Sequence, residues 1–151
     1  MSETAKAAAT SPVVAAADVA PNRRRGGDIR VVLSPKTVGS TSGFMGTLTV
    51  RPGEYVAEHY HPYSEEFVFV VSGTLVARVE DVGVFEVAAG EGFMVPIGRR
   101  HRVWNDGDSD VRAVFYLGPL APRPELGHVD TEELPVGGEA MSQPDVGAPR
   151  R

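Results

Sequence analysis

The chain has 151 residues, 42% of them hydrophobic, which is enough for one domain with a small core. Its formal net charge of −5 provides no basic surface, so we expect neither nucleic acid nor an anionic membrane as a partner. The absence of cysteine excludes disulfides, thiolate metal sites and cysteine nucleophiles, and it fits a reducing cytosol, where we expect the protein to be.

Residues 1–22 are rich in small side chains and lack periodicity, which predicts a disordered arm. They lack the basic start and continuous apolar core of a signal peptide, and no run in the sequence approaches the ~20 apolar residues of a membrane span. Three arginines follow at 23–25. They form either a solvated charge run or a pin that holds the arm to an acidic surface of this chain or a partner.

Residues 23–118 are divided into short apolar or alternating segments, and the 17 Gly and 12 Pro of the chain favour many short strands over long helices. The region 37–43 is predicted to be a loop. The predicted strands are 29–33, 44–50, 55–61, 66–71, 74–79, 84–87, 93–95, 101–105 and 111–117. About nine short strands predict an all-β, closed or double-sheet antiparallel barrel. Residues 119–134 are predicted to pack on it as a tail, and 135–151 to be disordered.

Strand parity predicts where the side chains of the fourth segment point. If Glu66 faces inward, then Phe67, Phe69 and Val71 face outward, and a strand that is apolar on both faces is covered on both faces. The cover is either the second sheet or tail, or a second copy of the chain. We expect a homodimer interface.

Metal-ligating residue types gather around the same strand. His59 and His61 are two positions apart, so both imidazoles leave one face of a strand, and Glu66 and His101 face inward on neighbouring segments. A lone histidine is more often a packed residue than a ligand. Three imidazoles with one carboxylate suit a divalent ion of the zinc, iron, manganese, nickel or copper group.

The spacing of these residues resembles the first motif of the cupins, which is Gly, five residues, His-X-His, three or four residues, Glu, six residues, Gly. Here the motif residues are Gly53, His59, His61, Glu66 and Gly73. Glu65 would fit the shorter gap after the histidines but breaks the six-residue gap to the glycine, so Glu66 is the predicted ligand.

The second cupin motif, Gly, five residues, Pro-X-Gly, two residues, His, three residues, Asn, is also met. Its residues here are Gly90, Pro96, Gly98, His101 and Asn105. The resemblance covers residues 44–117. It implies a double-stranded β-helix, or jelly-roll barrel, with one metal ion held by His59, His61, Glu66 and His101.

A narrower resemblance points to the small cupins of bacterial aromatic polyketide pathways, the tetracenomycin-type and resistomycin-type cyclases. It rests on residues 22–28, 33–35, 43–46, 59–67 and 119–130. It implies that the protein closes a ring of a poly-β-ketone intermediate of antibiotic or pigment biosynthesis by Lewis-acid-promoted aldol condensation. Zinc is the expected ion, and water on the metal would be the base.

Other residues and activities stay open. Glu65 and His128 are weaker catalytic or ligand candidates, because parity turns Glu65 away and a surface position is the simpler expectation for His128. Arginines around His101 could attract an acyl carrier protein. The same four ligands could hold Fe, Mn, Ni or Cu in an oxygenase acting on an aromatic or polyketide substrate. A non-catalytic binding or assembly subunit of a polyketide synthase is a further alternative.

Overall fold

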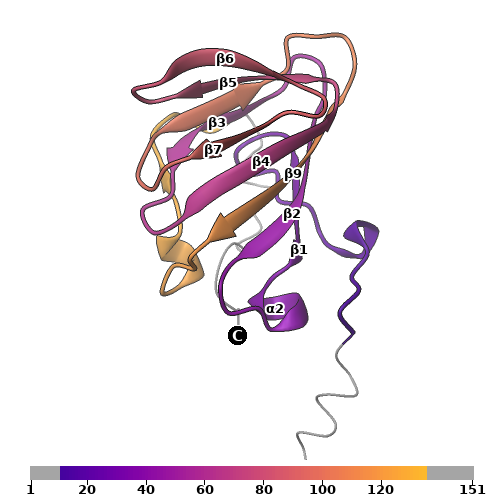
Figure 1. Cartoon of the computed structure of the whole chain (residues 1–151), viewed down its shortest axis with the longest axis vertical. Coiled ribbons are helices and arrows are strands. Elements are labelled where there is room, and N and C mark those ends of the chain that lie inside the picture. The colour runs from indigo at the N-terminus through magenta and orange to yellow at the C-terminus, as the bar shows by residue number, and fades with distance from the viewer. Residues whose placement is uncertain (1–10, 136–151) are drawn as a thin grey trace, which may run out of the picture.

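Two antiparallel sheets of five strands each build the protein, as the computed structural model of the chain shows for residues 11–135 (Figure 1). One sheet has the order β1-β2-β9-β4-β7 and the other β10-β3-β8-β5-β6. Each sheet mixes strands from early and late in the sequence, because most neighbours are joined by crossovers between the layers. The predicted all-β double-sheet barrel is confirmed.

The strands lie close to the predicted segments. Their bounds are β1 Asp28–Leu33, β2 Phe44–Val50, β3 Tyr55–Tyr60, β4 Glu65–Ser72, β5 Thr74–Val79, β6 Gly83–Ala88, β7 Gly92–Val95, β8 His101–Trp104, β9 Val111–Gly118 and β10 Val129–Asp130. Helical structure is limited to the short η1 Ala16–Asp18, α2 Pro35–Val38 and η2 Pro124–Leu126. Within the described part of the chain, no helix is long and apolar enough to cross a membrane.

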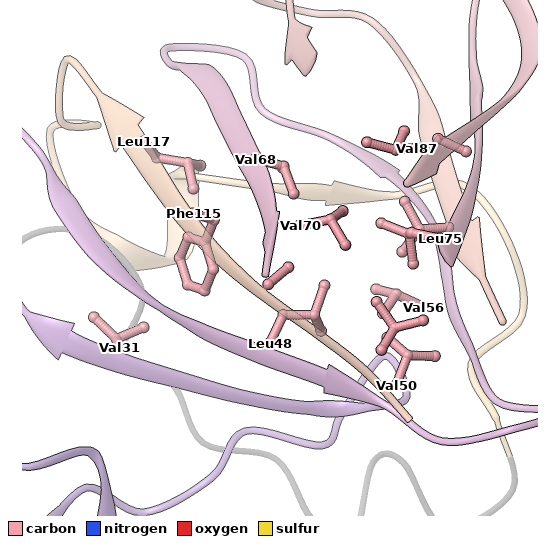
Figure 2. Packing of buried hydrophobic residues seen from close by; sticks show 14 of the residues in the cluster. Val31, Leu48, Val50, Val56, Val68, Val70, Leu75, Val87, Phe115 and Leu117 are labelled. Carbon is pink, nitrogen blue, oxygen red and sulfur yellow. The ribbon is translucent and has the colours of Figure 1, made fainter. Parts of the chain in front are cut away.

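The core lies between the two sheets and is built by alternate residues of each strand (Figure 2). On β4, Val68 and Val70 are buried, whereas Phe67, Phe69 and Val71 are 44–55% exposed. The predicted parity of this strand is therefore correct. Facing side chains such as Leu75 and Phe115 fill the interior with apolar atoms, so the barrel is a packed core over most of its length.

Glycine and asparagine of the two motifs have structural roles at the turns. Gly73 has φ of +80°, and a Cβ there would lie 2.6 Å from the Asp110 carbonyl oxygen, so a side chain would be both strained and blocked. Asn105 is buried; its Nδ2 donates to the carbonyls of Val50 and Ser109 at 2.8 Å, and its Oδ1 accepts from Gly107 N. These contacts fix the turn that follows β8.

Three segments depart from the sequence-based expectations. Residues 11–22 were expected to be disordered, but Arg30 Nη1 donates to the Ala16 and Val19 carbonyls at 3.2 Å and Asn22 pairs with Ile29, so this part has a defined path. The predicted loop 37–43 begins inside helix α2, which Ser34 caps. The strand β10 was not predicted. Residues 1–10 and 136–151, which contain the rest of the predicted disordered ends, lie outside the described residues.

Candidate metal centre

Four side chains from three strands and one loop converge at one place inside the barrel. His59 lies on β3, His61 directly after it, Glu66 on β4 and His101 on β8. One ligand atom from each lies within 4.8 Å of the others, and the three histidines are each no more than 7% exposed. The structure therefore brings together all four residues predicted from the motifs.

The backbone of β3 explains how two neighbouring histidines reach the interior. His59 is paired with His101, but the register between β3 and β8 shifts between Val56 and His59. At this irregularity both Val56 and Ala57 are buried, and Ala57 N donates to the Arg25 carbonyl at 2.8 Å instead of to a strand. The irregularity re-aims the end of β3 so that His59 and His61 face the interior.

Each histidine is oriented by a backbone carbonyl at its Nδ1. The distances are 2.8 Å from His59 to Ala57 O, 2.9 Å from His61 to Gly127 O, and 3.1 Å from His101 to Arg99 O. A carbonyl only accepts, so each Nδ1 carries the proton. In the neutral ring the lone pair is then on Nε2, the nitrogen that faces the cluster. Such carbonyl partners commonly fix metal-ligating histidines.

The Nε2 atoms of His61 and His101 face the Glu66 carboxylate. Glu66 Oε1 lies 3.0 Å from His101 Nε2 and 3.4 Å from His61 Nε2. The His101 Nε2 atom is buried and has no hydrogen-bond partner. A nitrogen and a carboxylate oxygen at such distances are stable together only with a proton or a metal ion between them. The donor set fits one divalent metal ion.

The surroundings favour a neutral His59 and an ionised Glu66. Burial, reinforced by His101, His61 and Arg25, lowers the pKa of His59 well below its usual value, so its ring is neutral near pH 7. Burial alone would raise the pKa of Glu66, but His101 and His61 outweigh it and hold that pKa well below its usual range. Metal binding needs neutral imidazoles and an ionised carboxylate.

A cavity of about 70 Å³ adjoins the cluster, and its wall is mostly apolar. Its apolar lining is Ile29, Val31, Phe44, Leu48, Val56, Val68, Leu75, Phe93, Val103, Phe115 and Leu117. Its polar lining consists of the four cluster residues together with Asn22 and Arg25. Typical ligand pockets measure ~300–1,000 Å³, so in this conformation the cavity accepts only a short segment of a ligand.

The two ends of the described chain meet beside this cavity. Asp130 of β10 binds Arg24 Nη1 at 2.7 Å and Arg25 Nε at 2.6 Å, and β10 pairs with the end of β3. Glu132 accepts from Glu58 N at 2.7 Å and from Arg102 Nε at 3.0 Å. We call residues 124–132 the strap. Of the two alternatives left open for the arginine run, a solvated charge run or a pin, Arg24 and Arg25 have the contacts of the second.

The weaker sequence candidates lie outside the cluster. Glu65 pairs with Gly118 and does not line the cavity. His128, expected at the surface, is instead partly buried in the strap; burial, followed by Arg25, lowers its pKa to about 3. Its Nδ1 has no hydrogen-bond partner, but the residue is not part of the four-residue cluster. Sequence reasoning missed Arg25 as a cavity residue, because its burial depends on Asp130, more than a hundred positions away.

Curated proteins of similar sequence come from Streptomyces. The chain is 59% identical to "Protein SchB" of Streptomyces halstedii, with 80% of this chain and 87% of that protein covered. It is 53% identical to "Polyketide synthase CurC" of Streptomyces cyaneus (89% and 86% covered). It is 47% identical to "Tetracenomycin polyketide synthase protein TcmJ" of Streptomyces glaucescens (92% and 91% covered).

Solved structures share the fold at lower sequence identity. A Klebsiella pneumoniae protein with a double-stranded β-helix domain matches with a TM-score of 0.64 and 20% identity, covering 82% of this chain and 99% of that one. Residues 46–116 also match the family described as "Cupin domain". With the paired sheets and both motifs in place, these matches show that the chain belongs to the cupin family, in the group that contains the Streptomyces polyketide synthase proteins.

Proposed function

We propose that this protein is a bacterial, cytoplasmic, metal-dependent cyclase that acts on an aromatic polyketide intermediate, with zinc bound by His59, His61, Glu66 and His101. The observation that carries the proposal is the convergence of these four groups beside an apolar cavity inside the barrel. The names of CurC and TcmJ, which refer to polyketide synthases, support the substrate class.

Ring closure by aldol condensation needs three things from the site. A proton must leave an activated methylene, the resulting enolate carbon must attack a ketone carbonyl carbon, and the carbonyl oxygen must gain a proton before water is lost. Bound zinc would supply Lewis-acid polarisation of a carbonyl or stabilisation of an enolate. The apolar wall would exclude water and hold the reacting segment near the cluster.

The protein's own side chains set the limits of this mechanism. Apart from the cluster, the described residues place only Asn22 and Arg25 as polar groups in the cavity wall, and neither is a base near pH 7. The proton must therefore be taken at the cluster itself. The small cavity also means that most of a long polyketide lies outside it unless the strap or the segment 22–25 moves.

Metal analysis of the native protein and of His61→Ala tests the function directly. We expect close to one zinc per chain in the native protein, loss of zinc in His61→Ala, and cyclisation of a poly-β-ketone substrate without O₂ uptake. His128→Gln is the matched control, because it alters a buried histidine outside the cluster, and it should retain the metal.

Two other outcomes would replace the proposal. Iron, manganese, nickel or copper together with substrate-dependent O₂ uptake would identify an oxygenase built on the same ligands. Absence of bound metal in a folded native protein would contradict the metal centre and leave a binding or assembly subunit. In that case His61→Ala would retain the biological role.

We further propose that the protein is a homodimer. The outer face of the β1-β2-β9-β4-β7 sheet exposes a set of large apolar side chains, which we call the outer patch: Met45, Phe67, Phe69, Val71 and Met94. Contiguous exposed apolar residues of this size commonly mark protein interfaces. An acyl carrier protein remains a further proposed partner, although Arg102 is already engaged by Glu132 and lies 4.3 Å from the Tyr55 ring centre.

A further inference from the structure

Arg25 is a buried cation in the wall of the cavity. Its residue is 5% exposed, and it lines the same cavity as the four cluster residues. Charged side chains are rarely this buried unless they are paired or bind a ligand. Arg25 therefore requires an explanation beyond the packing of the barrel.

Its partners account for only part of the guanidinium group. Arg25 Nε binds Asp130 Oδ1 at 2.6 Å, but Nη2 is buried and has no hydrogen-bond partner among residues 11–135. Leaving a buried donor unpaired costs about 1–3 kcal/mol, and more for a charged group. The unpaired Nη2 lowers the stability of the fold, so a purely structural role does not explain it.

Backbone contacts of residues 25 and 26 fix the position of Arg25. Its carbonyl accepts from Ala57 N, at the irregularity that aims His59 into the cluster. The next residue, Gly26, has φ of +103°, and a Cβ there would lie 2.0 Å from the Tyr55 carbonyl oxygen. The segment can approach β3 this closely only because residue 26 is glycine.

The local charge balance favours an anion. Arg24 and Arg25 share one carboxylate, Asp130, so this group of three carries a net positive charge. A divalent ion held by three neutral histidines and Glu66 would leave a second net positive charge beside it. An apolar cavity between two such groups stabilises negative charge strongly, because little water screens it.

We propose that Arg25 Nη2 binds an anionic oxygen of the substrate, so that the cavity takes an oxyanion segment between this guanidinium and the metal. The proposal rests on the proposed function and deepens it. In a poly-β-ketone chain, the anionic oxygens belong to the enolate of a β-diketone or to the carboxylate of a β-keto acid. Either group presents two oxygens in one short segment, which suits the volume of about 70 Å³.

Binding of two small probes tests the proposal. Acetoacetate offers a carboxylate, and acetylacetone offers an enolisable diketone without one; each is titrated calorimetrically into zinc-loaded and metal-free protein. Charge-assisted hydrogen bonds contribute about 1.5–3 kcal/mol, so Arg25→Gln should weaken binding by roughly 10–150-fold while metal content stays unchanged. If Arg25→Gln weakens the binding of acetoacetate alone, the oxygen bound by Arg25 belongs to a carboxylate. If it weakens the binding of both probes, that oxygen belongs to an enolate.

Arg24→Gln is the matched control. Arg24 binds the same Asp130 and adds to the positive charge of this group but does not line the cavity, so its variant should weaken the binding of both probes much less than Arg25→Gln does. Equal losses in Arg24→Gln and Arg25→Gln would overturn the proposal, since the effect would then come from a displaced strap. Unchanged binding in Arg25→Gln, or absence of binding to the native protein, would also overturn it.

A second measurement does not depend on the folding of Arg25→Gln. In ¹⁵N–¹H spectra of the native protein, acetoacetate should shift one guanidinium signal that persists in Arg24→Gln, and absence of a shift would overturn the proposal. Failure of the cyclase function has a different signature. Probe binding would then depend on Arg25 although no polyketide is cyclised, whereas cyclisation and probe binding that both survive Arg25→Gln would overturn only the role of Arg25.

Discussion

At the scale of single residues, the motif positions divide into groups that could hold a metal and groups that hold the fold. His101 and Asn105 belong to the same motif and are both buried, yet only His101 directs an unpartnered nitrogen into the cluster. Asn105 uses both ends of its amide on backbone atoms of the following turn and of β2. One motif therefore encodes chemistry and stability in different side chains.

Replacement of Asn105 should lower stability without removing the metal. Asn105→Ala leaves two carbonyls and one amide N–H of the turn without their partners, so we expect the free energy of unfolding to fall by about 2–4 kcal/mol. Urea unfolding of the metal-free proteins measures this change. Asp108→Ala, an exposed substitution in the same turn, should cost less than about 0.5 kcal/mol. Equal urea midpoints for the two variants would contradict the role of Asn105 in stabilising this turn.

His128 should make the stability of the metal-free protein depend on pH. Its pKa is about 3 in the folded protein and about 6.5 when exposed, so between these values the unfolded chain binds more protons and stability falls as pH decreases. His128→Gln removes this contribution, so its urea midpoint should change less between pH 7 and pH 4.5 than that of the native protein. If the urea midpoints of the native protein and His128→Gln changed equally with pH, His128 would be accessible to protons in the folded state.

The sequence predicted the cluster residues but not Arg25, and the reason is physical. His59, His61, Glu66 and His101 lie on strands whose alternation decides which way each side chain points, and this information is local. The burial of Arg25 instead depends on Asp130 and on the close approach that Gly26 allows. A triple arginine with two glycines after it was the only local signal, and such a run is usually solvated.

At the scale of elements, the strap completes the surroundings of the cluster. The Gly127 carbonyl orients His61, and Asp130 and Glu132 tie the strap to the N-terminal segment and to β3 and β8. A loop distant in sequence thus supplies a contact to one of the proposed ligands. Carbonyl partners of this kind typically contribute 10–100-fold to metal affinity.

Removal of the strap should weaken metal binding even though all four proposed ligands remain. A chain ending at Arg123 lacks the Gly127 carbonyl, so we expect zinc affinity to fall by about 10–100-fold, measured by competition with a chromophoric chelator. A chain ending at Pro135 is the matched control, because it retains every strap contact described above. Equal affinities of the two truncated proteins would show that His61 is oriented without the strap.

The predicted elements show which signals are local. The longer strands follow apolar alternation and turn residues, so β2 and β5 have the bounds expected from sequence, whereas β10 has two residues and exists only through its pairing with β3. Helix α2 occupies one turn in a region predicted to be a loop, although Ser34 and Pro35 are recognisable helix-start residues. Short elements stabilised by tertiary contacts leave little trace in a sequence.

At the scale of the whole molecule, the outer patch decides the expected assembly. Phe67, Phe69 and Val71 project from β4 away from the core, and Phe67 lies 6.2 Å from the Tyr116 ring, centre to centre. Neither the second sheet nor the strap covers these side chains, since they are about half exposed. Of the two covers expected from strand parity, the one within the chain is therefore not provided by residues 11–135.

A charge in the outer patch should separate the subunits. Phe69→Glu places a carboxylate in the centre of the proposed interface, so the protein should elute as a monomer in size-exclusion chromatography with light scattering, whereas the native protein should be a dimer. Metal content should be unchanged, because the patch faces away from the cluster. Val84→Glu, an exposed substitution on the other sheet, should remain dimeric. A native monomer would contradict the interface.

The contact of Asp130 with Arg24 and Arg25 has a consequence for the order of events during synthesis. Strands β1 to β9 can pair once β9 has left the ribosome, but the strap with β10 emerges afterwards, and only then are Arg24, Arg25 and His61 engaged by it. The nascent barrel is therefore open beside the cluster. We therefore expect the proposed metal ion to enter most easily in that interval and to be retained once the last described residues fold.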